Sequence, residues 1–89
     1  MAWKVELSGH GQRHLEALDR QVARRVLSFL FERVAQLEDP RSIGDALKGS
    51  RLGHLWRYRV GDFRVICDLK DNILTVLVVS VGNRREVYK

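Results

Sequence analysis

The sequence predicts an α+β fold, with a short N-terminal strand, two helices and then a group of strands. Three patterns lead to this prediction: period-two alternation in residues 3–7, apolar residues at helical spacing in residues 10–37, and three strand-like runs in residues 55–81. The 89 residues include one proline and no repeat or low-complexity stretch. We therefore expect residues 1–89 to form a single domain with one small core.

The N-terminal strand is predicted by Trp3, Val5 and Leu7, which alternate with Lys4 and Glu6. Side chains of a strand point alternately to its two faces, so this pattern places the apolar residues on one face and the charges on the other. We expect a short, half-buried strand.

Two helices are expected between His10 and Leu37, with a break near Asp19. Apolar residues recur there three and four positions apart, with charged residues between them, as on an amphipathic helix. They are Leu15, Leu18, Val22, Val26, Leu27, Leu30, Val34 and Leu37. Ser8 is suited to cap the first helix, and Pro40 ends the helical pattern because it lacks a backbone N–H. We expect the pair to form a hairpin that covers one side of a sheet.

The strands follow a connection at residues 41–54, in which Ala46–Gly49 is predicted to form a short helical turn. The runs 55–60 and 63–69 are separated by Gly61 and Asp62, a glycine-first loop suited to a type II′ hairpin turn. Asp71–Asn72 is predicted to make another turn. Residues 73–81 are almost all apolar and β-branched, which is typical of a central strand covered on both faces.

A two-residue loop fixes the register of the predicted hairpin and separates its two faces. The expected pairs are Val60 with Phe63, Arg59 with Arg64, Tyr58 with Val65, Arg57 with Ile66, and Trp56 with Cys67. One face then carries the apolar set, which is expected to pack on the helices. Cys67 belongs to this face and is interpreted as a buried, inert thiol. The other face carries Arg57, Arg59 and Arg64 together.

The arginine face is the candidate site. Arg59 opposite Arg64 is a like-charge cross-strand pair, which costs up to about 1 kcal/mol of stability. Guanidinium groups match phosphate oxygens in a bidentate manner, so an anion on this face accounts for the arrangement. The alternative is a solvated, salt-bridged face with Asp68 as the nearest carboxylate, but one carboxylate cannot neutralise three arginines.

The charge distribution agrees with an anionic partner. The formal net charge is +5; residues 1–40 carry six basic and six acidic residues, and residues 41–89 carry ten basic and five acidic ones. A localised basic excess is typical of proteins that bind nucleic acid or an acidic protein segment. The N-terminus has no apolar signal region, no apolar run reaches membrane-spanning length, and Cys67 is the single cysteine. We expect a cytoplasmic protein.

Other candidate ligands are less informative. His10 and His14 lie four residues apart on the first predicted helix and could share a metal ion, but no third ligand is evident. Both are interpreted as solvated residues, and no metal or other cofactor is expected.

Three segments together resemble the RelE/ParE toxin superfamily: Leu47–Gly49, Trp56–Ile66 and Val79–Tyr88. The resemblance extends over essentially the whole chain. It implies a RelE-like fold of β-α-α-β-β-β order, in which a largely antiparallel, twisted sheet has a helical hairpin on one face and an open, concave opposite face. For a RelE-type member, it also implies a toxin that enters the ribosomal A site and cleaves messenger RNA there.

The resemblance also implies an endoribonuclease chemistry, that of an mRNA interferase, in which the ribose 2′-hydroxyl attacks the adjacent phosphorus without a metal. By position, the catalytic residues implied are Arg59, Arg64, Arg84 and Tyr88. The RNA-binding residues implied are Lys48, Arg51, Arg57, Arg59 and Arg85. Arginine stays protonated, so it can only hold the phosphate and stabilise transition-state charge. Tyr88 is expected either to stack on a base or to accept the 2′-hydroxyl proton.

The partners implied are messenger RNA, the ribosome with its 16S ribosomal RNA, and a cognate acidic, RelB-like antitoxin. Two alternatives remain at this level. One is a ParE-like toxin that inhibits DNA gyrase by binding, without RNA cleavage. The other is a catalytically weak member retained for antitoxin or operator binding. The arginine constellation favours the ribonuclease, because a gyrase inhibitor does not need a phosphate-binding set.

Overall fold

A computed structural model describes residues 2–47 and 54–83. Its principal elements are β1 (Lys4–Leu7), α1 (Gly9–Ala17), α2 (Arg20–Ser28), β2 (Asp45–Ala46), β3 (Leu55–Val60), β4 (Phe63–Lys70) and β5 (Thr75–Asn83). A π-helical turn, Phe29–Arg33, and a 3₁₀ turn, Val34–Gln36, continue α2, and two further 3₁₀ turns span Pro40–Ser42 and Asp71–Ile73. The predicted α+β fold is confirmed.

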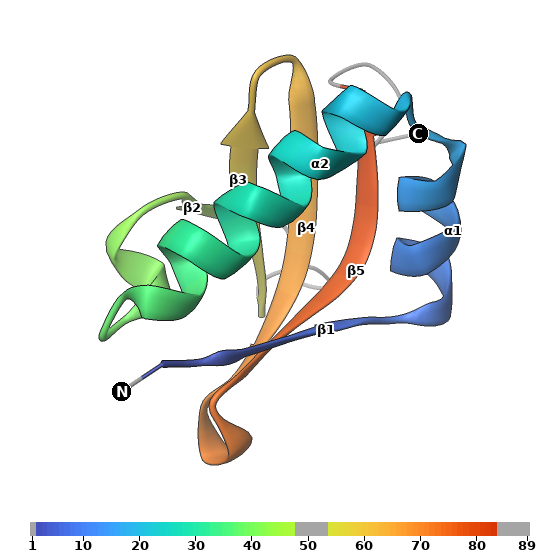
Figure 1. Cartoon of the computed structure of the whole chain (residues 1–89). Helices are drawn as coiled ribbons and strands as arrows, with labels where there is room; N and C mark the ends of the chain where they lie inside the picture. The colour runs from blue at the N-terminus through green and yellow to red at the C-terminus, as the bar shows by residue number, and fades with distance from the viewer. Residues whose placement is uncertain (1, 48–53, 84–89) are drawn as a thin grey trace.

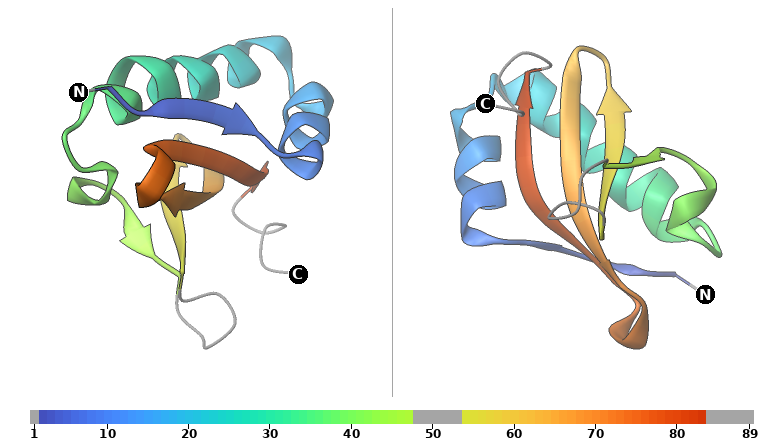
Figure 2. Two further views of the ribbon diagram at one scale, coloured as in Figure 1. Left: turned by 90° about the horizontal axis from the view of Figure 1, so that it is seen from below. Right: turned by 180° about the vertical axis from the view of Figure 1, so that it is seen from behind.

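Five strands form one mixed sheet in the order β1-β5-β4-β3-β2 (Figure 1). β1 runs parallel to β5, whereas the other neighbouring pairs are antiparallel. The predicted central strand is therefore confirmed in β5, which lies between β1 and β4, but the expectation that both of its faces are covered was wrong, since none of the described helices lies on the face of the sheet away from α2 (Figure 2). β2 was not predicted: Ala46, expected in a helical turn, instead pairs with Trp56 of β3. The other part of that expected turn, Lys48 and Gly49, lies outside the described residues.

The two predicted helices are confirmed, and each begins at a capping side chain. The Ser8 hydroxyl accepts a hydrogen bond from the Gly11 N–H at 3.0 Å, and the Asp19 carboxylate accepts one from the Gln21 N–H at 3.0 Å. Such caps satisfy backbone donors that a first helical turn leaves without partners. The break between the helices therefore falls at the predicted position.

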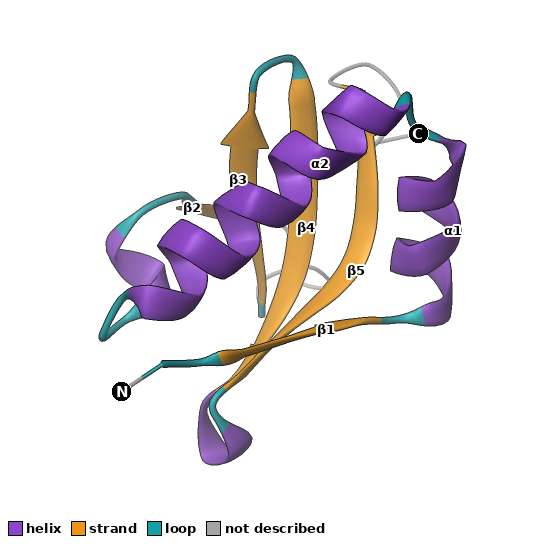
Figure 3. Cartoon of the chain, in the orientation of Figure 1, coloured by secondary structure: helices purple, strands orange, loops and turns teal. Residues whose placement is uncertain are grey.

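α2 lies across one face of the sheet, whereas α1 lies beside β5 at the edge of the sheet (Figures 1 and 3). α2 and its continuation cross the sheet diagonally and bury Val26, Leu30 and Val34. These side chains pack against buried residues of the sheet, and the shared cluster includes Trp3, Leu15, Tyr58, Val60, Val65, Cys67, Leu69, Val76, Val78 and Val81. α1 packs mainly against β5. The core thus lies between the sheet and the helical layer.

The opposite face of the sheet has neither α1 nor α2 on it (Figure 2). This open face is therefore where the polar side chains of the central strands can meet a partner.

In the described part of the chain, no helix combines the length and the apolar character needed to span a bilayer.

Candidate functional site

The β3–β4 hairpin builds the candidate site, and its predicted register is confirmed at every pair from Trp56–Cys67 to Val60–Phe63. Gly61 has a φ of +59°, and the next turn residue, Asp62, does not have a positive φ. This is the pattern of a type II′ turn, in which glycine is favoured at the first position. The turn matches the twist of the strands and so sets which side chains share the open face.

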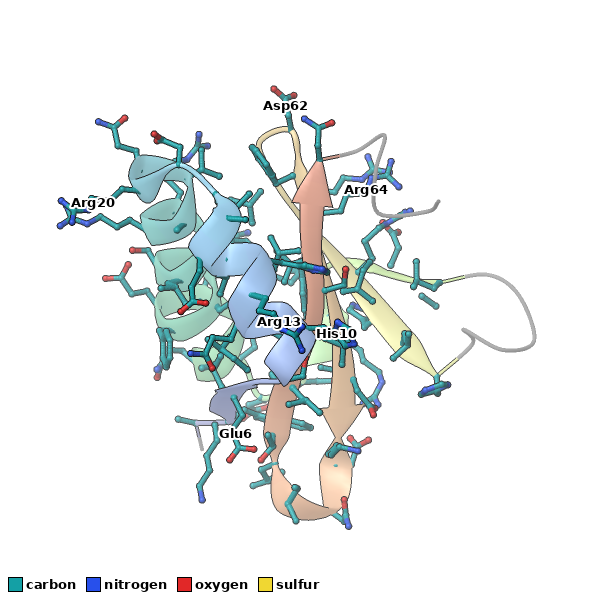
Figure 4. The ribbon with its side chains drawn as sticks, turned by 90° about the vertical axis from the view of Figure 1, so that its right-hand side faces the viewer. Glu6, His10, Arg13, Arg20, Asp62 and Arg64 are labelled. Atoms are coloured by element: carbon teal, nitrogen blue, oxygen red, sulfur yellow. The ribbon has the colours of Figure 1, made fainter. Side chains whose placement is uncertain are left out.

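Arg59, Arg64 and Gly82 form one row across β3, β4 and β5. Arg59 is exposed and Arg64 is half-buried, and in Figure 4 Arg64 points away from the helical layer. Because Gly82 has no side chain, nothing projects beside Arg64 at that position of β5. Arg59, Arg64 and the turn residues Gly61 and Asp62 line a small pocket of about 70 Å³. Arg59 and Arg64 thus border one small concavity beside the turn.

The next row contains Asp45, Arg57, Ile66 and Ser80, from β2 to β5. The Arg57 Nη2 atom lies 3.1 Å from the Asp45 Oδ2 atom, and only 17% of the Arg57 side chain is exposed. Asp68, expected to be the nearest carboxylate to the arginines, instead contacts the Lys70 Nζ atom at 3.1 Å. That expectation was wrong because β2 pairs with β3 and places Asp45 next to Arg57.

Asp45 reaches Arg57 because the preceding residue, Gly44, lies very close to β3. Gly44 has a φ of +83°, and a Cβ atom at this position would meet the Arg57 carbonyl oxygen at 2.5 Å. Only glycine fits a site with this backbone conformation and so little space. A glycine followed by an acidic residue was visible in the sequence, but a two-residue strand is too short for a periodicity argument to detect.

The packed face of the same hairpin holds the site in place. The Tyr58 hydroxyl donates to the Pro40 carbonyl oxygen at 2.7 Å in a buried position. Burial raises the pKa of Tyr58, so this hydroxyl stays protonated and remains a donor. Cys67 is fully buried, as predicted, and burial raises the pKa of its thiol. An inert thiol and an anchored tyrosine are structural features of this face.

His14 holds the edge of β5 beyond the point where β1 ends. β1 pairs with β5 only as far as Leu7 and Val78. Past this point the His14 Nδ1 atom accepts a hydrogen bond from the Val81 N–H at 3.1 Å and lies 3.3 Å from the Ser80 hydroxyl. The interpretation of His14 as solvated was therefore wrong, whereas His10 is exposed. Among residues 2–47 and 54–83, no three side chains of metal-binding type are grouped to hold an ion.

Comparison with known proteins identifies the family. A family model described as the ParE toxin of the type II toxin–antitoxin system parDE matches residues 5–88. The chain belongs to the ParE toxin family. The resemblance to the RelE/ParE superfamily is thereby confirmed. No curated protein matches this ParE-family chain in sequence.

Solved structures of RelE proteins share the fold of this ParE-family chain. A chain of the RelBE2 toxin–antitoxin complex from Mycobacterium tuberculosis is 22% identical, with a TM-score of 0.85 over 97% of this chain and 95% of that chain. A chain of the archaeal RelE–RelB complex from Pyrococcus horikoshii is 24% identical, with a TM-score of 0.72 over 98% and 100%. The isolated RelE toxin of Escherichia coli is 20% identical, with a TM-score of 0.72 over 98% and 92%.

The predicted site residues of this ParE-family member divide into two groups. Arg57, Arg59 and Arg64 lie on the open sheet face, as predicted. The other predicted residues lie outside the described part of the chain; they are Lys48, Arg51, Arg84, Arg85 and Tyr88. The last described residue, Asn83, pairs with Phe63 at the start of β4. β5 therefore ends beside the hairpin turn, next to the Arg59–Arg64 pocket.

Proposed function

We propose that this ParE-family protein is a cytoplasmic toxin that cleaves messenger RNA in the ribosomal A site and is neutralised by a cognate, RelB-like antitoxin. The observation that carries the proposal is the Arg59–Arg64–Gly82 row. Two like charges directly opposite each other reduce stability, and they do so around a pocket in which a phosphate group would relieve the repulsion.

The proposed reaction is an attack of the ribose 2′-oxygen on the adjacent phosphorus. The new bond from the 2′-oxygen to phosphorus forms as the bond from phosphorus to the 5′-oxygen breaks, which leaves a 2′,3′-cyclic phosphate and a 5′-hydroxyl. Arg59 and Arg64 would hold the non-bridging oxygens and stabilise the additional charge of the transition state. Arg84 would stabilise the same charge, and Tyr88 would either accept the 2′-hydroxyl proton as its phenolate or stack on a base. Water would donate the proton that converts the departing 5′-oxygen into the 5′-hydroxyl.

Messenger and ribosomal RNA contacts are assigned to the remaining basic residues, Lys48, Arg51, Arg57 and Arg85. The salt bridge between Arg57 and Asp45 suits a positioning role for Arg57, because its guanidinium is already held by a carboxylate. The antitoxin is proposed from the family and from two structural relatives, which are complexes of RelE-type and RelB-type chains.

Inhibition of DNA gyrase is the second candidate function. It is favoured by the family model itself, which bears the ParE name. A toxin that acts by binding gyrase has no requirement for two arginines around a phosphate-sized pocket. The two candidates therefore make different predictions for substitutions of Arg64.

The decisive experiment is cleavage of a messenger RNA programmed on purified ribosomes. We expect the wild type to cut within A-site codons and Arg64→Ala to slow cleavage by at least about 10²-fold. Tyr88→Phe should slow cleavage by a similar factor if Tyr88 accepts the 2′-hydroxyl proton, whereas a small effect would leave Tyr88 a stacking role. Arg24→Ala removes an exposed arginine from the helical layer and serves as the matched control. Absence of cleavage by a folded, toxic wild-type protein would exclude the ribonuclease and favour gyrase as the target.

A further inference from the structure

A second, larger pocket lies at the β3 edge of the sheet, next to the arginine row. Its volume is about 310 Å³, and it lies between the π-helical turn after α2, the segment leading into β2, and β3. The lining residues that matter here are Phe29, Arg33, Ile43, Asp45, Tyr58 and Arg59. The strand edge is accessible here because β2 pairs with only two residues of β3.

The floor of this edge pocket is aromatic and fixed. The Phe29 and Tyr58 rings meet edge to face with centroids 5.8 Å apart, and the Tyr58 hydroxyl is anchored on Pro40. The Arg33 guanidinium lies 5.9 Å from the centroid of the Phe29 ring. A planar cation beside a fixed aromatic ring is a platform on which flat, aromatic ligands stack.

The polar groups of the edge pocket are of both signs. Arg33 and Arg59 are exposed cations, whereas Asp45 presents a carboxylate that is 57% exposed and is held in place by Arg57. An acidic peptide would place its carboxylates beside that of Asp45. A nucleobase avoids this conflict, because its amino and imino groups donate hydrogen bonds to a carboxylate while its phosphate favours the arginines.

The edge pocket adjoins the Arg59–Arg64 pocket at Arg59, which lines both. A phosphate on Arg59 and Arg64 would therefore place a neighbouring base at the entrance of the edge pocket. Recognition of single-stranded RNA commonly combines such phosphate contacts with stacking and with hydrogen bonds to the base edge.

We propose that the edge pocket binds the base of a nucleotide adjoining the phosphate held by Arg59 and Arg64, with Arg33 stacking on the base and Asp45 accepting its N–H groups. Guanine presents two adjacent donors on its pairing edge and is the preferred base, whereas uracil presents one. This inference rests on the proposed RNA-cleaving function and adds to it a residue pair that selects sequence.

The test measures binding without cleavage. Fluorescein-labelled hexanucleotides that lack every 2′-hydroxyl cannot undergo attack on phosphorus, so their anisotropy reports affinity alone. We compare an all-uracil hexamer with one that contains a single guanine. The wild type is expected to bind the guanine-containing hexamer about tenfold more tightly, the range typical of one good base contact.

Two variants and a matched control locate the effect. Arg33→Ala is expected to reduce the preference for guanine to about twofold or less, because a base that no longer stacks on Arg33 is not held beside the Asp45 carboxylate. Asp45→Asn should do the same by removing the carboxylate. Arg24→Ala removes the same charge from the same helical layer, outside the pocket, and should leave the preference at its wild-type value. Near-ultraviolet circular dichroism checks that each variant keeps its packing.

The outcomes separate this inference from the proposed function. If both hexamers bind equally well, and Arg64→Ala weakens both while Arg33→Ala behaves as Arg24→Ala does, the edge pocket is not a base site and the phosphate site stands. If no oligonucleotide binds at all, the inference about the edge pocket fails, whereas the proposed function is still decided by cleavage on programmed ribosomes. If a polyglutamate peptide competes through Arg33 while no base is preferred, the pocket is a site for an acidic protein segment, which overturns the inference.

Discussion

The two faces of the β3–β4 hairpin are made by alternate residues of the same two strands, yet they have opposite effects on stability. The covered face buries Tyr58, Val65 and Cys67 against the helices. The open face places Arg59 directly opposite Arg64. Burial of apolar surface stabilises the fold, whereas a like-charge cross-strand pair opposes it. The comparison indicates that the covered face maintains the fold and that the open face is arranged for a ligand.

Arginines outside the hairpin provide a reference for this comparison. The helical layer also carries exposed arginines, including Arg20 and Arg24 on α2. Figure 4 shows Arg20 on the side of the molecule opposite Arg64. These helical arginines contribute to net charge without lining the two pockets described above. They allow the effect of position to be separated from the effect of charge.

The largest expected effect is on RNA affinity. The double variant Arg59→Ala/Arg64→Ala should bind single-stranded RNA at least about 10²-fold more weakly, because it loses two charge-assisted contacts worth roughly 1.5–3 kcal/mol each. The slope of log affinity against log salt concentration should fall by about 0.7, because the variant no longer neutralises the one phosphate that the two arginines share. Filter binding over a salt series measures both quantities.

The control for that experiment is Arg20→Ala/Arg24→Ala, which changes the net charge by the same amount. We expect its affinity to stay within about threefold of the wild type, since both arginines belong to α2 on the helical side of the sheet and surface charges are screened within a Debye length of about 10 Å. Equal losses in the two double variants would show that RNA binding follows net charge and would remove the distinction between the two regions.

Substitutions on the covered face should instead lower the stability of the fold. Tyr58→Phe removes the buried hydroxyl that donates to the Pro40 carbonyl oxygen at 2.7 Å and leaves that acceptor without its partner. The expected decrease in the free energy of unfolding is about 1–3 kcal/mol. Urea denaturation measures the decrease, and an unchanged midpoint would contradict the anchoring role of Tyr58.

Alkaline pH provides a second measurement of the same anchor. Burial raises the pKa of Tyr58 in the folded state, whereas the phenol of the unfolded chain ionises near its ordinary value of about 10. Its stabilising contribution is therefore complete below that pH and is lost as the pH rises further, because the unfolded state releases the proton first. We expect Tyr58→Phe to show a weaker loss of stability above about pH 10 than the wild type.

The hairpin could be predicted from the sequence because everything that determines it is local. A two-residue loop beginning with glycine fixes the register, and period-two alternation then assigns each side chain to a face. The helices and their break were predictable for the same reason: helical spacing and the capping residues Ser8 and Asp19 are short-range patterns. The arginine row of the candidate site followed directly from the register.

The parts of the site that were not predicted depend on contacts between distant residues. Asp45 contacts Arg57 through a strand of two residues, and His14 contacts Val81 at a separation of 67 residues. The edge pocket likewise combines residues of the helical layer with residues of β3. Neither hydrophobic periodicity nor a short sequence motif predicts such contacts. They follow from how the helices and strands pack.

Loss of the contact between His14 and the edge of β5 should have a smaller effect, which is a decrease in the free energy of unfolding. His14→Ala removes the acceptor of the Val81 N–H, and a lost hydrogen bond at a partly buried site costs about 1–2 kcal/mol. His10→Ala is the matched control, because His10 is exposed one helical turn earlier; its effect should stay within about 0.5 kcal/mol. Thermal unfolding of both variants measures the difference, and equal effects would contradict the edge contact.

The smallest expected effect is the most specific to the open face. Replacing Arg59 and Arg64 by glutamine, singly and together, forms a double-mutant cycle that isolates their mutual interaction from every other contact that either side chain makes. We expect an unfavourable coupling of up to about 1 kcal/mol, since the two residues are direct cross-strand partners. The coupling should weaken as salt rises and disappear when a phosphate-containing ligand is bound. A favourable coupling without ligand would mean that the pair stabilises the fold, and the main reason for placing a phosphate between these arginines would then be lost.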